Sequence, residues 1–401
     1  MISKDVINQI VNSQQERLLL MDTLLLREIP KLQMNTSQAM IVQGVRRCGK
    51  STWLHQIFKK YEQAAIFLNF EDPRLSGFNL QDFNRLHEIA LEKNCTAYFF
   101  DEIQNIHQWE SFVRFRLDER YQVFITGSNA SMLSKELGTK LTGRHISKEM
   151  FPFSYAEFIS FKQIASNENS TISYLNNGGF PEYLKTGNPD VLMHLFNDII
   201  IRDIAVRYGI KNTAILMQLA AWLVSNIGKL FTANSLRKII PIQSSSTMME
   251  YLAYFADSYL FFYVPKFSYS YKTQIINPKK LYCIDNGLVK INSISFTDNV
   301  GRLFENMVFL QLRRFYSEIY YFNEKKECDF VVFEKGNIHK LYQACWVLNQ
   351  DNTQRETEGL LDALIFFNLT TGYIITHQQH DSFIVENKTI IVLPFHEWIG
   401  G

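Results

Sequence analysis

The chain has 401 residues, 46% of them hydrophobic, and its 41 Lys and Arg nearly balance 40 Asp and Glu to leave a formal net charge of +1. This length allows two or three domains, each with its own core, and the near-neutral charge gives no global support for nucleic-acid binding, which would have to depend on a local patch. No apolar stretch approaches eighteen uncharged residues, and the N-terminus lacks the basic start and apolar run of a signal peptide.

The cysteines favour a cytoplasmic location. There are five, an odd number, widely spaced and without a C-x-x-C pair. That usage indicates reduced thiols and argues against structural zinc. They are Cys48, Cys95, Cys283, Cys328 and Cys345.

Residues 1 to about 160 alternate strand-like and helix-like segments after a helical entry from 5 to about 26. The alternation predicts an α/β fold, with a doubly wound parallel sheet covered by helices on both faces. The expected strands lie near 40–43, 65–70, 97–100, 123–126 and 146–150.

A phosphate-binding loop follows the first expected strand. The run MIVQGVRRCGKST at 40–52 fits the pattern G-x-x-x-x-G-K-[ST] through Gly44, Gly49, Lys50 and Ser51. In such a loop backbone N–H groups turn toward a phosphate, the lysine reaches the β- and γ-phosphates, and the serine takes Mg²⁺. A chance glycine-rich turn is the alternative, but the flanking strand and helix are the context that the motif requires. Nucleotide contacts are expected from Gly44, Val45, Arg46, Arg47, Cys48, Gly49, Lys50, Ser51 and Thr52.

Two carboxylates end the strand expected at 97–100, about fifty residues after the loop. Ligands of a doubly wound sheet lie beyond the carboxyl ends of its strands, so Asp101 is expected to face the Mg²⁺ held by Ser51. Glu102, one residue further, is placed to take a proton from an attacking water. Alone, an Asp-Glu pair is better interpreted as a solvated turn; paired with the loop, it favours catalysis.

Further catalytic candidates follow the next strands. Ser128 and Asn129 are expected to hold the attacking water or sense the γ-phosphate. Arg144 is placed to reach a γ-phosphate, often that of a neighbouring subunit, which would imply a homo-oligomer. A structural arginine that caps a carbonyl or pairs with a carboxylate is an equal alternative for Arg144. Arg46 and Arg47, inside the loop, are better suited to bracing it or meeting a neighbour than to touching phosphate.

The middle of the chain, about 165 to 292, is predicted to be mostly helical. Its start, 164–171, is polar and linker-like, and 176–181 is dense in turn residues. Thr232 is a candidate N-cap for a short helix, and after a proline turn a second helix with a Ser/Thr cap runs to about 257.

Two strand-like runs, 259–265 and 281–285, follow these helices and are joined by a Tyr/Ser/Lys loop. Helix, turn, helix and a two-stranded wing form a winged-helix pattern. From 229 to 290 there are eight Lys or Arg and three Asp or Glu, a local net charge of 8 − 3 = +5, and the hydroxyls of 244–247 could meet phosphates or base edges. A protein-contact module is the alternative to DNA binding. Lys266, Lys272, Lys279 and Lys280 would then be no more than a solvated loop.

The C-terminal part has the layout of a restriction-endonuclease-like site. A helix at 301–312 carries Glu305, a strand at 327–333 carries Asp329, and a strand at 340–346 carries Gln343. Sites of this kind hold a divalent cation with two or three carboxylates and usually have a lysine two residues after the last one.

This candidate nuclease site is degenerate. Gln343 is neutral where glutamate is commoner, and Cys345 stands where the lysine would be. Losing a carboxylate weakens metal binding, and losing the lysine removes an electrostatic catalyst. Nuclease activity is therefore not expected unless Lys325, Lys326 or Lys340 substitutes from another position.

These motifs resemble the prokaryotic ATP-binding proteins of the AAA superfamily, in which a P-loop domain precedes a winged-helix segment and a restriction-endonuclease-like region. The resemblance implies ATP and Mg²⁺ as ligands and carries the nucleotide site onto Lys50, Ser51, Asp101, Glu102 and Arg144. No base-reading motif is visible in the sequence, so the choice of ATP over GTP rests on the resemblance alone. It carries the nuclease site only onto Glu305 and Asp329. The matching segments are 44–52, 99–104, 125–128, 141–144, 151–158, 178–182, 284–287 and 327–330.

The resulting hypothesis has three domains: 1–160, a P-loop ATPase; 161–292, a helical and winged-helix region; and 293–401, a nuclease-like domain expected to be inactive. ATP binding and hydrolysis would control the two later regions, which would contact DNA. The alternatives are a slow nucleotide-controlled switch that binds a protein partner, and an ATP-regulated metal-dependent nuclease.

Overall fold

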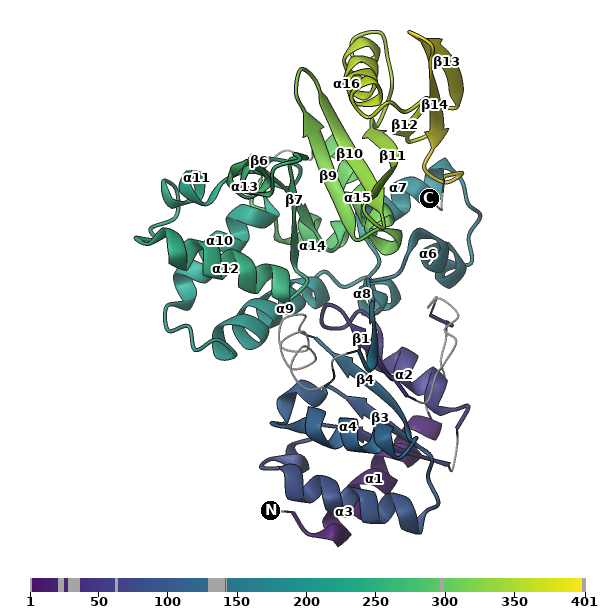
Figure 1. Cartoon of the computed structure of the whole chain (residues 1–401), viewed down its shortest axis with the longest axis vertical. Helices are drawn as coiled ribbons and strands as arrows, with labels where there is room; N and C mark the ends of the chain where they lie inside the picture. Colours follow the sequence, from purple (N-terminus) through teal and green to yellow (C-terminus); the bar gives the residue numbers. More distant parts are fainter. Residues whose placement is uncertain are drawn as a thin grey trace. The chain divides into compact units, whose positions relative to one another are not determined.

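The computed structural model describes residues 2–20, 25–27, 37–61, 64–128, 141, 143–295 and 299–398. The chain forms two compact units, Met1–Phe151 and Pro152–Gly401 (Figure 1). No helix in the described part of the chain is long and apolar enough to cross a membrane.

The first unit is built on five parallel strands in the order β2-β3-β4-β1-β5. The prediction of five strands is confirmed, each within one or two residues of its expected position. The strands are β1 (Ala39–Gln43), β2 (Ala65–Asn69), β3 (Ala97–Asp101), β4 (Gln122–Gly127) and β5 (His145–Glu149).

Helices cover both faces of this sheet because successive side chains of its central strands point to opposite sides and are apolar on both. On one face Tyr98 and Phe100 pack in a cluster with residues of α1 (Lys4–Leu19), α3 (Leu80–Glu92) and α4 (Trp109–Asp118). On the other face Phe99 stacks on Phe124, with ring centroids 4.3 Å apart, and meets Phe58 of α2 (Lys50–Phe58) edge-on. The doubly wound arrangement is therefore confirmed.

The second unit begins with helices, and one sequence-based expectation about them is wrong. The polar stretch 164–171 is not a linker: Asn167 caps α7 (Glu168–Asn177), and the side chains of Ser170 and Thr171 are buried in its first turn. Capping residues are the same polar types that make up linkers, which explains the misinterpretation. The helices around it are α6 (Tyr155–Lys162), α8 (Pro181–Thr186), α9 (Asp190–Asp198), the π-helical segment η4 (Ile199–Val206) and α10 (Thr213–Val224).

A small helical and three-stranded region follows α10. Thr232 caps α11 (Ala233–Arg237), and Ser244 caps α12 (Ser245–Asp257), as predicted. The antiparallel sheet has the order β6-β8-β7. Its strands are β6 (Leu230–Phe231), β7 (Phe261–Pro265) and β8 (Lys279–Cys283), and the connection from β7 to β8 contains a short helix, α13 (Tyr271–Ile276).

Strand β8 ends at Cys283, earlier than expected, because Asp285 serves another purpose. Its Oδ1 accepts the N–H of Leu288 in α14 (Asn286–Asn292) at 3.0 Å, and its Oδ2 accepts the N–H of Gly179 at 2.6 Å. This buried carboxylate therefore joins the start of α14 to the turn after α7. The segments 178–182 and 284–287, which took part in the family resemblance, thus meet at a structural contact.

The chain ends in a six-stranded mixed sheet of order β13-β14-β12-β11-β10-β9, with α16 packed on β10, β11 and β12. Strands β11, β12 and β14 are parallel to one another, and the remaining pairs are antiparallel. The elements are α15 (Val300–Phe315), β9 (Glu318–Asn323), β10 (Glu327–Glu334), β11 (Asn337–Ala344), α16 (Thr353–Phe366), β12 (Thr371–Thr376), β13 (Asp381–Val385) and β14 (Lys388–Pro394).

Candidate functional site

The glycine-rich loop connects the carboxyl end of β1 to the first residue of α2, Lys50. Gly49 caps the helix with φ = 107°, a conformation that side chains disfavour. Gly44 lies so close to the chain after β5 that a Cβ there would stand 2.0 Å from the carbonyl oxygen of Met150. The backbone geometry therefore explains why glycine is required at both of these positions of the motif. The free N–H groups of the first turn of α2 are available to an anion.

Lys50 is buried and lies across the loop. Its Nζ donates to the carbonyl oxygens of Gly44 and Val45, each at 3.0 Å, and stands 3.7 Å from Glu102 Oε1. The lysine therefore links the loop to the carboxylates that end β3.

Asp101 is fully buried at the carboxyl end of β3. It accepts hydrogen bonds from the Thr126 hydroxyl and, at 3.1 Å, from Asn69 Nδ2. Burial raises the pKa of Asp101 to about 6, and the neighbouring charge of Glu102 acts in the same direction, against the hydroxyls of Thr126 and Ser51. Because the Ser51 hydroxyl acts to lower the pKa of Asp101, the two expected Mg²⁺ ligands lie near each other.

Glu102 adopts a left-handed backbone conformation with φ = 53°, which is strained for a residue other than glycine. Its N–H donates to Thr126 Oγ1 at 3.3 Å, and its carboxylate accepts from Gln104 Nε2. Burial acts to raise the pKa of Glu102, but the Lys50 ammonium and the Gln104 hydrogen bond outweigh burial and lower it. Of the two adjacent carboxylates, Glu102 is the one that is more readily ionised.

The other predicted catalytic residues have different surroundings. Ser128 is buried, and its Oγ lies 3.4 Å from Gln104 Nε2, which places it beside Glu102. Asn129 lies outside the described residues. Arg144 is exposed and pairs with Asp118 of its own unit, in the manner of the structural alternative, so its role at a γ-phosphate stays a prediction.

The arginines near the loop are mainly engaged with protein groups. Arg46 Nη2 stands 3.3 Å from Glu71 Oε1, and Arg47 has a left-handed φ of 61°. Arg27, which the sequence did not single out, donates to the carbonyl oxygens of Cys48 and Phe151, the latter at 2.8 Å. Arg27 therefore braces the loop. This role could not be predicted from the sequence, because Arg27 lies outside any recognisable motif.

Sequence reasoning also missed three polar residues of the site: Asn69, Gln104 and Thr126. Asn69 ends β2, Thr126 is the second-last residue of β4, and Gln104 follows β3. The same rule that selected Asp101, that ligands gather at the carboxyl ends of parallel strands, selects Asn69 and Thr126 when applied to every strand.

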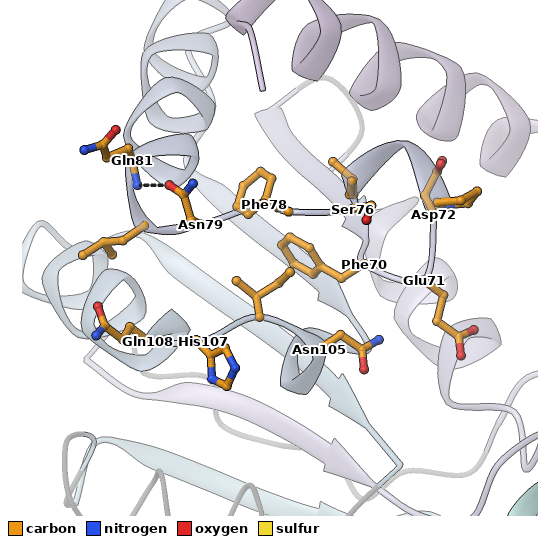
Figure 2. A pocket seen from close by; sticks show the side chains of 15 residues that line it. Phe70, Glu71, Asp72, Ser76, Phe78, Asn79, Gln81, Asn105, His107 and Gln108 are labelled. Atoms are coloured by element: carbon orange, nitrogen blue, oxygen red, sulfur yellow. Dashed lines mark hydrogen bonds between the residues drawn. The ribbon is translucent and has the colours of Figure 1, made fainter. Parts of the chain in front are cut away.

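A cavity of about 910 Å³ opens at the carboxyl ends of β2 and β3 (Figure 2). It is lined by residues 70–73, 75–81 and 105–108, with Phe70 and Phe78 on its walls. One lining residue, Glu71, is the partner of Arg46, so the cavity borders the phosphate-binding loop without including it.

The donor set at the loop suits Mg²⁺ bound together with a nucleotide. Ser51 supplies a hydroxyl and Asp101 a carboxylate, and Mg²⁺ usually takes few protein ligands and completes its octahedron with phosphate and water oxygens. Among the described residues no group of three or more His, Cys, Asp and Glu is arranged to hold a metal ion without such help.

In the second unit the predicted nuclease-like residues are also brought together. Gln343 Oε1 accepts the N–H of Asp329 at 3.1 Å, and Glu305 and Asp329 both contact Lys280 Nζ, at 3.1 and 2.8 Å. They border a cavity of about 730 Å³.

Lys280 corrects the sequence-based view of this region. The sequence places it in a basic patch or, as the alternative, in a solvated loop, yet it is 2% exposed. Of the three lysines considered as substitutes, Lys326 lines this cavity and its Nζ lies 2.8 Å from Glu358. Lys340 lies over the Tyr373 ring, and the backbone N–H of Lys325 donates to Asp362.

Comparison with known proteins identifies the class of the first unit. Residues 36–159 match a family described as "AAA domain", and residues 168–295 match a domain of unknown function. A chain in the structure of Drosophila ORC bound to AT-rich DNA and Cdc6 is 12% identical, covers 72% of this chain and 94% of that one, and superimposes with a TM-score of 0.21, too low to establish a shared fold. The protein carries a P-loop domain of AAA type.

Two uncharacterised proteins each match more than four fifths of the chain. The one from Methanocaldococcus jannaschii is 36% identical over 392 residues, covering 89% of this chain and 87% of the relative. The one from Haemophilus influenzae is 30% identical over 349 residues, covering 82% and 86%. The chain belongs to one family with these proteins.

Thr126→Val tests the hydrogen bonding of Asp101. Valine keeps the shape and removes the hydroxyl that donates to the buried carboxylate, so we expect the free energy of unfolding to fall by about 1–3 kcal/mol. Chemical denaturation followed by circular dichroism measures it. Thr96→Val, which removes an exposed hydroxyl from the same unit, is the control and should change stability by less than about 0.5 kcal/mol. Equal effects of the two substitutions would contradict the account.

Proposed function

We propose that the protein is a Mg²⁺-dependent ATPase. The observation that carries this proposal is the meeting of Lys50, Ser51, Asp101 and Glu102 at the carboxyl edge of the parallel sheet. The loop from 44 to 51 would cradle the triphosphate, with Lys50 on the β- and γ-phosphates and Ser51 and Asp101 on the Mg²⁺ side. Bound Mg²⁺ would neutralise charge that develops on the phosphates. ATP is proposed as the nucleotide because of the match to AAA domains.

Glu102 is proposed as the base that orients and activates water. Its lowered pKa keeps it ionised near neutral pH, as a proton acceptor requires. In the structure its carboxylate is held by Gln104 and faces Lys50. Lys50 would turn toward phosphate when nucleotide binds, and Glu102 would then be left with Gln104 and the Ser128 hydroxyl beside it.

Glu102→Gln tests this assignment. The amide keeps the shape and cannot accept the proton, so turnover should fall by about 10²–10⁴-fold while ATP affinity is preserved. Phosphate release and equilibrium binding of a fluorescent ATP analogue give the two readouts. Glu88→Gln, on the exposed side of α3, serves as the matched control. Wild-type turnover in Glu102→Gln would remove Glu102 from the mechanism.

Arg144 is proposed to act in an assembly, on the γ-phosphate of a neighbouring subunit. Its exposed guanidinium pairs with Asp118. An arginine finger contributes about 10³–10⁵-fold to turnover, so Arg144→Ala should lower kcat strongly with little change in ATP affinity. Asp118→Ala separates the two roles, because it breaks the same ion pair and leaves the arginine in place. Equal losses of turnover in both variants would make Arg144 a structural residue.

The segment from α10 to β8 is proposed to be a winged helix, and the domain limits 161–292 and 293–401 are proposed with it. The order helix, strand, helix, helix, strand, short helix, strand over residues 213–283 supports this proposal. Exposed hydroxyls at Ser244 and Ser245 begin α12, the helix that would approach DNA. The local charge of +5 overstates the electrostatic attraction of this segment for DNA, because Lys280 is buried among carboxylates and Lys266 pairs with Glu324 at 3.0 Å.

A protein partner is the second candidate for this segment. On and beside α13, Tyr269, Tyr271, Ile275 and Ile276 are 83%, 75%, 52% and 66% exposed. Exposed apolar side chains grouped in this way are typical of interaction surfaces. Measuring ATP turnover with and without double- and single-stranded DNA decides between the candidates: stimulation supports DNA contact, and slow turnover indifferent to DNA supports a nucleotide-controlled switch that binds a protein.

The region from α15 to β14 is proposed to be restriction-endonuclease-like and inactive. Its helix carrying Glu305, its strand carrying Asp329 and the following strand carrying Gln343 stand in the expected order. Cys345, at the position expected for a lysine, is buried and its thiol contacts the carbonyl oxygen of Val347.

A further inference from the structure

A buried lysine stands among three carboxylates in the second unit. Lys280 of β8 places its Nζ 3.1 Å from Glu305 Oε1, 2.7 Å from Glu327 Oε1 and 2.8 Å from Asp329 Oδ1. The side chains of Lys280, Glu305 and Asp329 are 3%, 14% and 9% exposed, and that of Glu327 is 39% exposed. We call these four residues the Lys280 cluster.

The contacts of the Lys280 ammonium match its chemistry. An ammonium has three N–H donors and no acceptor, and here it meets one oxygen from each of three carboxylates. The distances to Glu327 and Asp329, 2.7 and 2.8 Å, are those of charge-assisted contacts, and the distance to Glu305 is longer, at 3.1 Å. A divalent cation shared by the same oxygens would need distances of about 2.0–2.6 Å from a point close to Nζ. The ammonium and a metal ion therefore exclude each other from this position.

The lysine stays charged there. Burial acts to lower the pKa of Lys280, but the charges of Asp329 and Glu305 outweigh it and raise the pKa well above its usual range. Glu305 accepts a further hydrogen bond from the Tyr282 hydroxyl at 2.6 Å. Loss of the proton would leave these carboxylates without a counter-charge, which favours the charged form of the lysine.

The neighbouring groups that could coordinate a metal ion already form hydrogen bonds within the protein. Asp329 Oδ2 accepts the N–H of Ala344 at 3.0 Å. Gln343 Nε2 donates to Glu356 Oε2 at 2.6 Å, a contact in which a glutamate at 343 would meet a second carboxylate. Gln343 therefore fits its surroundings as an amide, and the residues present do not fit a resident metal ion.

We propose that the Lys280 ammonium takes the place of the divalent cation in this nuclease-like centre. The lysine neutralises the carboxylates, ties β8 to α15 and β10, and closes the centre to metal. Its removal leaves a vacant, negatively charged position bordered by Glu305, Glu327 and Asp329, which a divalent cation such as Mn²⁺ would fill. This inference does not depend on ATP hydrolysis.

The test measures Mn²⁺ binding to the full chain without nucleotide, from the loss of the free-ion EPR signal and the shift in Tm on adding MnCl₂. Lys280→Ala should gain one Mn²⁺ site and a Tm increase with Mn²⁺ that the wild type does not show. The gain should disappear in Lys280→Ala/Asp329→Asn. Lys279→Ala, which removes a neighbouring ammonium of β8, should behave like the wild type. If Lys280→Ala does not fold with or without Mn²⁺, Lys280→Gln replaces it.

Two results would overturn the proposal. One is Mn²⁺ binding by the wild type that is lost in Asp329→Asn, since the carboxylates would then hold a metal beside the lysine. The other is a folded Lys280→Ala or Lys280→Gln variant that binds no more Mn²⁺ than the wild type. Neither result bears on the phosphate-binding loop, so failure here and failure of the proposed ATPase are distinguishable.

Discussion

Charges buried in the protein must be neutralised or hydrogen-bonded, and both candidate sites are organised by this constraint. In the first unit Lys50 faces Glu102, and hydroxyl and amide groups surround Asp101. In the second unit Lys280 faces three carboxylates. A lysine close to acidic side chains is thus common to both sites. The sites differ in whether the lysine leaves the carboxylates accessible to a ligand.

Lys50 makes two of its hydrogen bonds to carbonyl oxygens of its own loop, which a phosphate can replace. In the proposed site Ser51 and Asp101 would then be left to hold Mg²⁺. The Lys280 ammonium donates to Glu305 and Asp329 and pairs with Glu327 at the point where a cation would bind. Similar side chains would therefore serve the proposed nucleotide site in one unit and the proposed closed centre in the other. The geometry around the ammonium, and not the presence of acidic residues, separates the two cases.

Local patterns predicted what depends on local sequence. The five strands of the first unit, the caps at Thr232 and Ser244, and the positions of Lys50, Asp101 and Glu102 follow from motif spacing and apolar periodicity. The burial of Lys280 could not be predicted in this way. Lys280 lies 49 residues from Asp329 in the chain, and its burial depends on how β8 packs beside α15 and β10. Asp285 was misplaced in a strand for the same reason, since its partner Gly179 is 106 residues away.

The most direct measurement is equilibrium binding of a fluorescent ATP analogue to the wild type and to Lys50→Ala, with and without Mg²⁺. The account predicts that the wild type binds more tightly with Mg²⁺, that unlabelled ATP competes, and that Lys50→Ala, whose fold is checked by circular dichroism, loses most of the affinity. Equal binding by a folded Lys50→Ala, or no binding by the wild type, would contradict the assignment of this loop as the nucleotide site.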